Sequence, residues 1–190
     1  TGAVSVSSTG DDSTTGDGPK QDMGVPACPP DPQETTFDYI WIANTSQGTV
    51  SKINTMTGVE EGRYLTHPQA GQAQPSRTSV NQYGDVAVSN RSLGSVTKVW
   101  ALKSKCVDTN GNGMIDTSTG ANDIKPWGQD ECIAWHTPLP LANGYSGGVR
   151  PTAWEGVAQD PNTCVTAVPR LWVGYKDAQN TAHFARLHGD

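Results

Sequence analysis

The nine residues DTNGNGMID, 108–116, carry oxygen-bearing side chains at alternate positions with glycines between them. Calcium takes about six to eight oxygen ligands, and an EF-hand loop supplies them from positions 1, 3, 5, 7, 9 and 12. With Asp108 as position 1, Gly113 falls at position 6, where the sharp turn requires glycine. Ile115 then takes the place of the apolar residue that packs into the core. We expect calcium ligands from Asp108, Asn110, Asn112, Asp116 and the carbonyl of Met114.

The EF-hand pattern ends at position 12, because Thr119 stands where a bidentate glutamate would be. Another carboxylate must complete the site. Asp123 is the first choice, followed by Asp130 and Glu131. The alternative is an Asn/Gly-rich turn that binds no cation. In either case the loop is expected to stabilise the fold and to perform no chemistry.

Four cysteines allow three disulfide pairings, and the absence of a CxxC pair argues against a zinc ribbon. Cys106 and Cys132 bracket the predicted calcium loop, so a disulfide between them would close an insertion over 106–132. Cys28 would then pair with Cys164. Disulfides persist in oxidising compartments, and a weak calcium loop suits extracellular millimolar calcium. Both inferences predict a secreted or cell-surface protein.

The composition bounds the partners of this chain of 190 residues. A net charge of −6 argues against nucleic acid and against an anionic membrane surface. No apolar run is long enough to form a membrane-spanning segment. The 21 glycines and 13 prolines favour turns over helices.

Three segments differ in composition. Residues 1–24 form a Ser/Thr/Gly/Asp-rich tail, residues 25–36 are Pro-rich, and residues 37–190 contain short apolar runs separated by turns. Within the tail, AVSVSS (3–8) alternates enough to add as a strand to the edge of another copy or a partner. Sugar attached to the Ser/Thr hydroxyls of the tail is the alternative to such strand pairing.

The apolar runs form a repeat. Strands are expected at 39–44 and 49–54, and again at 85–90 and 95–100, with an offset of 94 − 48 = 46 residues between Gly94 and Gly48. A third copy is expected at 170–175 and 183–188. Pro-containing strands at 75–80 and 150–155 precede the second and third copies, and 132–137 is a strand after the insertion.

Repeats of about 40–50 residues made of short strands are typical of β-propeller blades, and a β-sandwich is the alternative. The chain holds about three blades, whereas propellers have about four to eight. The ring would be incomplete, with exposed strand edges that invite pairing. We therefore expect other copies of the chain, or another polypeptide, to complete it.

The pattern IWIAN-x3-G-x-V-x-K-I-N-x-x-T-G at 40–58 resembles the repeats of streptogramin-lyase-like and NHL/YncE-type secreted bacterial β-propellers. GDVAVSNRSLGSVTKV (84–99) and the insertion with its PWGQDEC ending resemble them as well. The resemblance covers about residues 37–190 and implies the propeller fold. The lyase activity of that family needs a magnesium site and a catalytic histidine, and neither falls on matching positions here.

Other chemistry-bearing residues have structural interpretations. GYSGG (144–148) matches a nucleophile elbow, but no strand precedes it and no helix follows, so a flexible loop is expected. The four histidines are expected to be solvated or at strand edges. Trp41 and Trp172 occupy equivalent repeat positions and should pack between blades. Trp127 and Trp154 lie in or near loops, where they would pack locally or bind carbohydrate or protein.

The sequence thus predicts a secreted, calcium-stabilised propeller module that serves in binding or extracellular assembly and is not catalytic. Two alternatives belong to other classes. One is a lyase-like propeller enzyme, and the other is a polymerising subunit of an extracellular filament.

Overall fold

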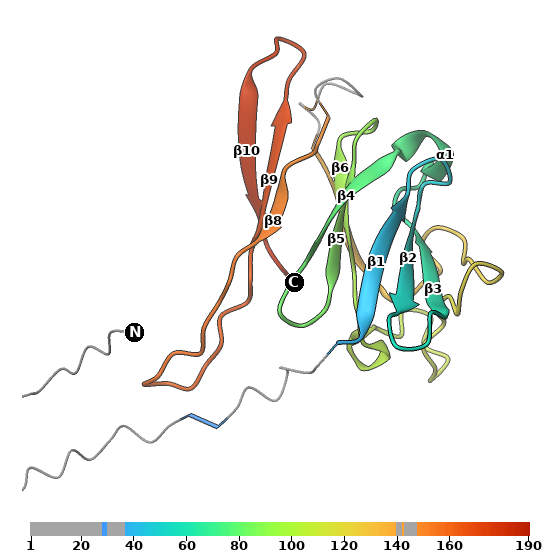
Figure 1. Ribbon diagram of the computed structural model, residues 1–190, viewed down its shortest axis with the longest axis vertical. Helices are drawn as coiled ribbons and strands as arrows, with labels where there is room; N and C mark the ends of the chain where they lie inside the picture. The colour runs from blue at the N-terminus through green and yellow to red at the C-terminus, as the bar shows by residue number, and fades with distance from the viewer. Residues whose placement is uncertain (1–27, 30–36, 140–141, 143–147) are drawn as a thin grey trace, which may run out of the picture.

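A computed structural model describes residues 28–29, 37–139, 142 and 148–190, and in them the chain is all-β apart from two short helical turns. Ten strands form three antiparallel sheets (Figure 1). The strands are β1 (Tyr39–Asn44), β2 (Thr49–Asn54), β3 (Glu60–Leu65), β4 (Pro75–Val80), β5 (Val86–Asn90), β6 (Ser95–Val99), β7 (Ile133–Pro138), β8 (Thr152–Trp154), β9 (Leu171–Lys176) and β10 (Ala182–Leu187). The helical turns are α1 (Ala70–Ala73) and η1 (Lys103–Lys105).

Sheet 1 has the order β1–β2–β3, sheet 2 has β4–β5–β6–β7, and sheet 3 has β8–β9–β10. Strand β4 of sheet 2 lies beside β1 on one side and β8 on the other, so sheet 2 is in the middle (Figure 1). The strands expected between residues 39 and 188 are all present, whereas β3 and α1 were not predicted. Within the described residues, no helix is long and apolar enough to span a membrane.

The sequence repeat is also a repeat of strand register. Ile40 pairs with Ile53, Val86 with Val99, and Leu187 with Leu171. Therefore β1–β2, β5–β6 and β9–β10 are equivalent hairpins. Strand β4 precedes the second hairpin as β8 precedes the third, and β7 follows the second as β3 follows the first. Sheet 2 is thus a complete four-stranded antiparallel unit. Sheet 1 has the last three strands of this unit, and sheet 3 has the first three.

Each hairpin has two faces, because residues paired across antiparallel strands point to the same side. One core lies between sheets 1 and 2 and contains Trp41, Val50, Tyr64, Val86, Val88 and Val99. A second core lies between sheets 2 and 3 and contains Ala87, Val96, Leu139, Val149, Leu171 and Val173. Sheet 2 therefore buries both of its faces, and its β5 and β6 are buried along their whole length.

Both expected disulfides are present. Cys106 is bonded to Cys132, and Cys28 is bonded to Cys164 in the turn between β8 and β9. The tail over 1–24, its strand prediction at 3–8 and most of the Pro-rich segment and of the GYSGG loop lie outside the described residues.

Candidate functional site

The 106–132 insertion connects β6 to β7, and its base is closed by the Cys106–Cys132 disulfide. The Trp100 amide donates to the Cys132 carbonyl over 2.9 Å, which continues the strand pairing to the disulfide. From there the insertion reaches back to sheet 1, where the Arg63 amide of β3 donates to Ser118 Oγ over 2.9 Å. The insertion of sheet 2 thus contacts the outer strand of sheet 1.

The loop at 108–116 turns at two glycines in left-handed backbone conformation, Gly111 with φ 73° and Gly113 with φ 81°. Such angles favour glycine, which explains why glycine stands at both positions. The Asp108 carboxylate lies inside the turn and accepts from the amides of Gly111 and Gly113 at 2.6 and 2.9 Å. Asp108 therefore holds the loop in its curled form.

Three of the predicted ligands converge on one point. The Nδ2 atoms of Asn110 and Asn112 donate to the same Asp116 Oδ2, at 2.8 and 2.7 Å. Their Oδ1 atoms accept backbone amides from Asn112 and Met114. A carboxylate approached by two terminal amides is a cluster of oxygen donors once the amides rotate, and oxygen is what calcium prefers.

Ile115 packs against the core between sheets 1 and 2, as its position in the pattern predicts. Met114 is 67% exposed, and the expected role of its carbonyl as a calcium ligand stays a prediction.

The structure places Asp123 in a separate turn. Its Oδ2 accepts from the Thr119 amide and hydroxyl at 3.2 and 3.0 Å, and its Oδ1 pairs with Lys125 at 2.7 Å. The hydrogen bond from Lys125 lowers the pKa of this carboxyl. Both oxygens of Asp123 are engaged away from 108–116, so the structure offers no support for the choice of Asp123 as the completing ligand.

Glu131, ranked behind Asp123 from the sequence, is the carboxylate that reaches the loop. Its Oε1 accepts from the amides of Thr109 and Asn110 at 2.7 and 3.2 Å, and its Oε2 accepts from the Asp116 amide at 2.8 Å. These bonds, that from Asp116 first, lower the pKa of the Glu131 carboxyl. The sequence held a signal for this contact. Glu131 directly precedes Cys132, and the Cys106–Cys132 disulfide therefore places Glu131 beside the first residues of the loop.

Asp130, the other carboxylate ranked behind Asp123 from the sequence, faces the other arm of the insertion. It accepts from Thr117 Oγ1 at 2.8 Å and from the Ser118 amide at 3.0 Å, and burial raises the pKa of its carboxyl. Across the described residues, no three His, Cys, Asp or Glu side chains gather as a metal cluster. A cation at 108–116 would therefore depend on amide and carbonyl oxygens beside Asp108 and Asp116. These donors fit calcium, whose ligands include both kinds of oxygen.

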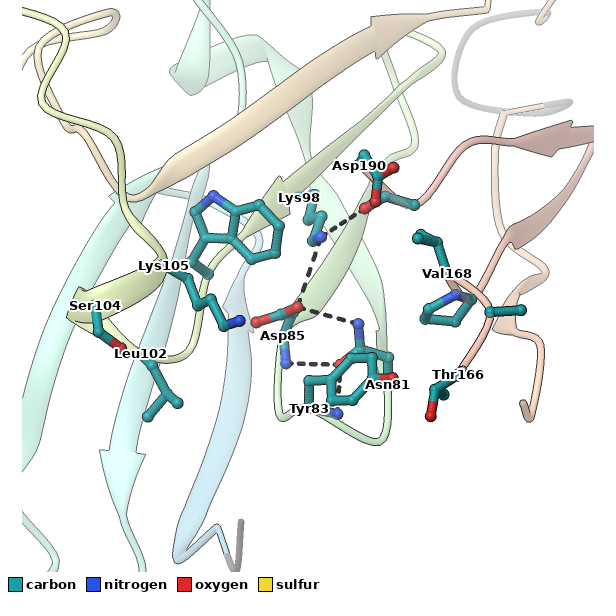
Figure 2. A pocket seen from close by; sticks show the side chains of 14 residues that line it. Asn81, Tyr83, Asp85, Lys98, Leu102, Ser104, Lys105, Thr166, Val168 and Asp190 are labelled. Carbon is teal, nitrogen blue, oxygen red and sulfur yellow. Dashed lines mark hydrogen bonds and ion pairs between the residues drawn. The ribbon is translucent and has the colours of Figure 1, made fainter. Parts of the chain in front are cut away.

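A second candidate is a cavity of about 420 Å³ between sheet 2 and the chain's last residues (Figure 2). Lys98 enters it from β6, with Nζ 3.3 Å from the centre of the Trp100 ring and 3.6 Å from Asp85. Burial lowers the pKa of Lys98 to about 8. A lysine with such a pKa could act as a nucleophile or base.

The contacts of the cavity favour a structural interpretation. Lys98 Nζ donates to the Gly189 carbonyl at 2.5 Å. Asp85 accepts from Asn81 Nδ2 at 3.1 Å (Figure 2). It also accepts from the Ala101 amide at 3.0 Å. Lys98 thus joins sheet 2 to the segment after β10. Lys52, its repeat equivalent in sheet 1, donates to the Ala101 carbonyl after β6 at 2.6 Å.

The histidines include one packed group that the sequence did not indicate. His136 lies edge-on to His67 at 4.9 Å and to Trp127 at 5.2 Å, and its Nδ1 is 2.9 Å from Thr97 Oγ1. Burial, and then the nearby His67, lower the pKa of His136 to about 4. His183 pairs with Asp177 at 2.8 Å.

The two tryptophans expected in or near loops, Trp127 and Trp154, make packing contacts, and Trp154 is the last residue of β8. Trp127 packs against His136, as above, and Trp154 is half-buried with its indole N–H donating to the Ser79 carbonyl at 3.0 Å. These contacts agree with local packing; they do not test the expectation of carbohydrate binding.

No protein-family model matches the chain, and no curated protein matches it. The resemblance to streptogramin-lyase-like and NHL/YncE-type propellers therefore stays a prediction.

Proposed function

We propose that the chain is a secreted or cell-surface β-propeller module, stabilised by calcium, that serves in binding or extracellular assembly and is not catalytic. The observation that carries the proposal is the convergence of Asn110 and Asn112 on Asp116 within a loop that Asp108 curls. The three-sheet stack with equivalent hairpins supports the propeller arrangement.

Calcium in this loop would be held by the side-chain oxygens of Asp108, Asn110, Asn112 and Asp116 and by the Met114 carbonyl. Glu131 acts as a positioning residue, since its carboxylate already accepts amides from both ends of the loop. The bound cation would neutralise Asp108 and Asp116 and rigidify the insertion. Because the insertion contacts β3, this would strengthen the junction between sheets 1 and 2.

An extracellular location is supported by the two disulfides, which persist in oxidising environments. A loop of mostly neutral ligands is expected to bind calcium weakly, with a dissociation constant on the order of 0.1–1 mM, as in extracellular modules. That affinity would keep the loop filled outside the cell.

The test is calcium titration by isothermal calorimetry together with thermal unfolding. Asp116→Asn keeps the shape of the side chain and removes the charge on which both amides converge. We expect it to weaken calcium binding at least tenfold and to abolish the rise in Tm that calcium causes in the wild type. Asp108→Ala should also abolish binding, but it removes two loop hydrogen bonds as well.

Asp123→Asn is the matched control, because Asp123 lies in the same insertion but is engaged by Thr119 and Lys125. It should leave calcium affinity within about twofold of the wild type. Wild-type protein that shows neither heat of binding nor a shift in Tm at 10 mM calcium, about ten times the weakest affinity expected here, would contradict the calcium proposal.

A further inference from the structure

One face of sheet 3 is apolar and exposed. Phe184 is 76% exposed and Trp172 is 44% exposed, and Arg186 lies between them on the same face because it pairs with Trp172. Arg186 is held by Glu155 at 2.8 and 3.1 Å and lies 5.6 Å from the Trp172 ring. We call these three residues the sheet 3 outer face; sheet 3 lies at one end of the stack (Figure 1).

The repeat shows what such a face does elsewhere. By the hairpin registers, the equivalents in sheet 1 are Trp41, Val50 and Lys52, and all three are buried against sheet 2. The equivalents in sheet 2 are Ala87, Val96 and Lys98, buried against sheet 3. This face of the unit thus packs on the following sheet at both junctions.

The opposite face of the repeat is exposed only at the other end of the stack. Ile40 and Ile42 of sheet 1 are 48% and 43% exposed. Their equivalents, Val86 and Val88 in sheet 2 and Leu171 and Val173 in sheet 3, are buried against the preceding sheet. The two ends of the stack therefore present the two halves of an interface that the chain already forms twice.

The lysine contacts at these junctions extend the argument to polar groups. Lys52 donates to the carbonyl of Ala101, two residues beyond Val99, and Lys98 donates to that of Gly189, two residues beyond Leu187. Arg186 is the third member of this series and is exposed. The carbonyl equivalent to those of Ala101 and Gly189 in sheet 1 belongs to Thr55, two residues beyond Ile53.

We propose that the sheet 3 outer face binds the Ile40 and Ile42 face of sheet 1 in a second copy of the chain, head to tail. Trp172 and Phe184 would cover the two isoleucines, and Arg186 would exchange Glu155 for the Thr55 carbonyl of that copy. The contact is heterologous, so one copy keeps a free sheet 1 face and the other keeps a free sheet 3 outer face. The inference rests on the proposed assembly role and names its partner and surface.

Sedimentation velocity over a range of protein concentrations tests the proposal on the disulfide-bonded chain. Phe184→Asp places a carboxylate on the sheet 3 outer face, and Ile42→Asp does so on the sheet 1 face. We expect the wild type to self-associate and each variant alone to be monomeric, with association weakened at least tenfold. Val59→Asp is the control, since Val59 is 56% exposed in the β2–β3 turn and lies on neither face.

Mixing the two variants is the decisive measurement. Ile42→Asp keeps an intact sheet 3 and Phe184→Asp keeps an intact sheet 1, so a mixture should form a dimer that grows no further. A wild type that stays monomeric, a variant that still self-associates alone, or a mixture that forms no dimer would overturn the proposal. If the tail over 1–24 mediated association instead, each variant would still self-associate on its own. Calcium affinity should be unchanged in both variants, so a failure here is separate from a failure of the calcium loop.

Discussion

Trp41 and Trp172 occupy the same position of the repeat and differ in what covers them, so together they test the description of the sheet junctions. Trp41 is 6% exposed, packs 5.9 Å from Tyr64 between sheets 1 and 2, and donates its indole N–H to the Gly84 carbonyl at 3.0 Å. Trp172 is 44% exposed and donates to Glu155 at 2.7 Å. Trp41→Ala and Trp172→Ala are the perturbations.

Trp41→Ala should lower the free energy of unfolding by about 3–5 kcal/mol, the range for deleting a buried aromatic side chain. Loss of the indole N–H leaves the buried Gly84 carbonyl without that donor, which contributes about 1 kcal/mol within this total. Trp172→Ala removes an exposed ring, a surface hydrogen bond and a contact with Arg186. It should cost less than about 1 kcal/mol. The expected difference between the variants is about 3 kcal/mol.

Urea unfolding at 25 °C, followed by far-UV circular dichroism, measures this difference without dependence on tryptophan fluorescence. The protein concentration must be low enough to keep the chain monomeric. Association would bury the Trp172 side chain and so increase the loss of stability measured for Trp172→Ala. Equal losses in the two variants would refute the assignment of Trp41 to a buried junction and Trp172 to an exposed face. So would a loss below about 1 kcal/mol for Trp41→Ala.

Two further predictions follow from the backbone and from pH. Gly48 and Gly58 have nearly the same left-handed φ, 69° and 70°, but a Cβ at Gly48 would overlap the Ala70 carbonyl of α1, whereas Gly58 has open space. In urea unfolding, Gly58→Ala should lower the free energy of unfolding by about 1 kcal/mol because of its backbone conformation. Gly48→Ala should lower it by at least about 2 kcal/mol more, because the added Cβ meets α1. Equal losses would contradict the packing of α1 on the β1–β2 turn. The pKa of His136 is lowered to about 4, so between pH 6.5 and 4 the unfolded chain binds more protons than the folded one and stability falls as the pH falls. That loss should be on the order of 1–3 kcal/mol, and it should be smaller in His136→Gln; an unchanged pH profile in that variant would show that another group, such as His67, carries the dependence.

The strands could be predicted because the repeat marks them twice or three times. The hairpin at 39–54 has the same register as the one at 85–99, and alternation fixes which side chains share a face. Strand β3, EEGRYL, escaped prediction because charged residues fill half of it. It is a strand because Tyr64 packs on Trp41 and Arg63 binds the insertion, which are tertiary contacts that local sequence does not report.

The calcium loop was predictable in its local part and not beyond it. The glycine positions and the apolar Ile115 follow from the DTNGNGMID pattern, whose spacing is set by the loop itself. The structure does not support the choice of Asp123 over Glu131. Asp123 is nearer to the loop in sequence, but Glu131 is the residue that contacts the loop in space. The Cys106–Cys132 disulfide brings Glu131 under the loop from the far end of the insertion, while Lys125 and Thr119 hold Asp123 in its own turn.

The two buried lysines share one position in the fold, at the contacts between sheets. Burial lowers the pKa values of Lys52 and Lys98. Lys52 of sheet 1 contacts the segment after β6 of sheet 2, and Lys98 of sheet 2 contacts the segment after β10 of sheet 3. The insertion binds β3 across the first junction, and the Trp154 indole donates to the Ser79 carbonyl across the second. The Cys28–Cys164 disulfide links the segment before sheet 1 to a turn of sheet 3. A perturbed pKa is therefore explained at these positions by burial between stacked sheets. The assembly proposed above rests instead on the exposed apolar residues Ile40, Ile42, Trp172 and Phe184 at the two ends of the stack.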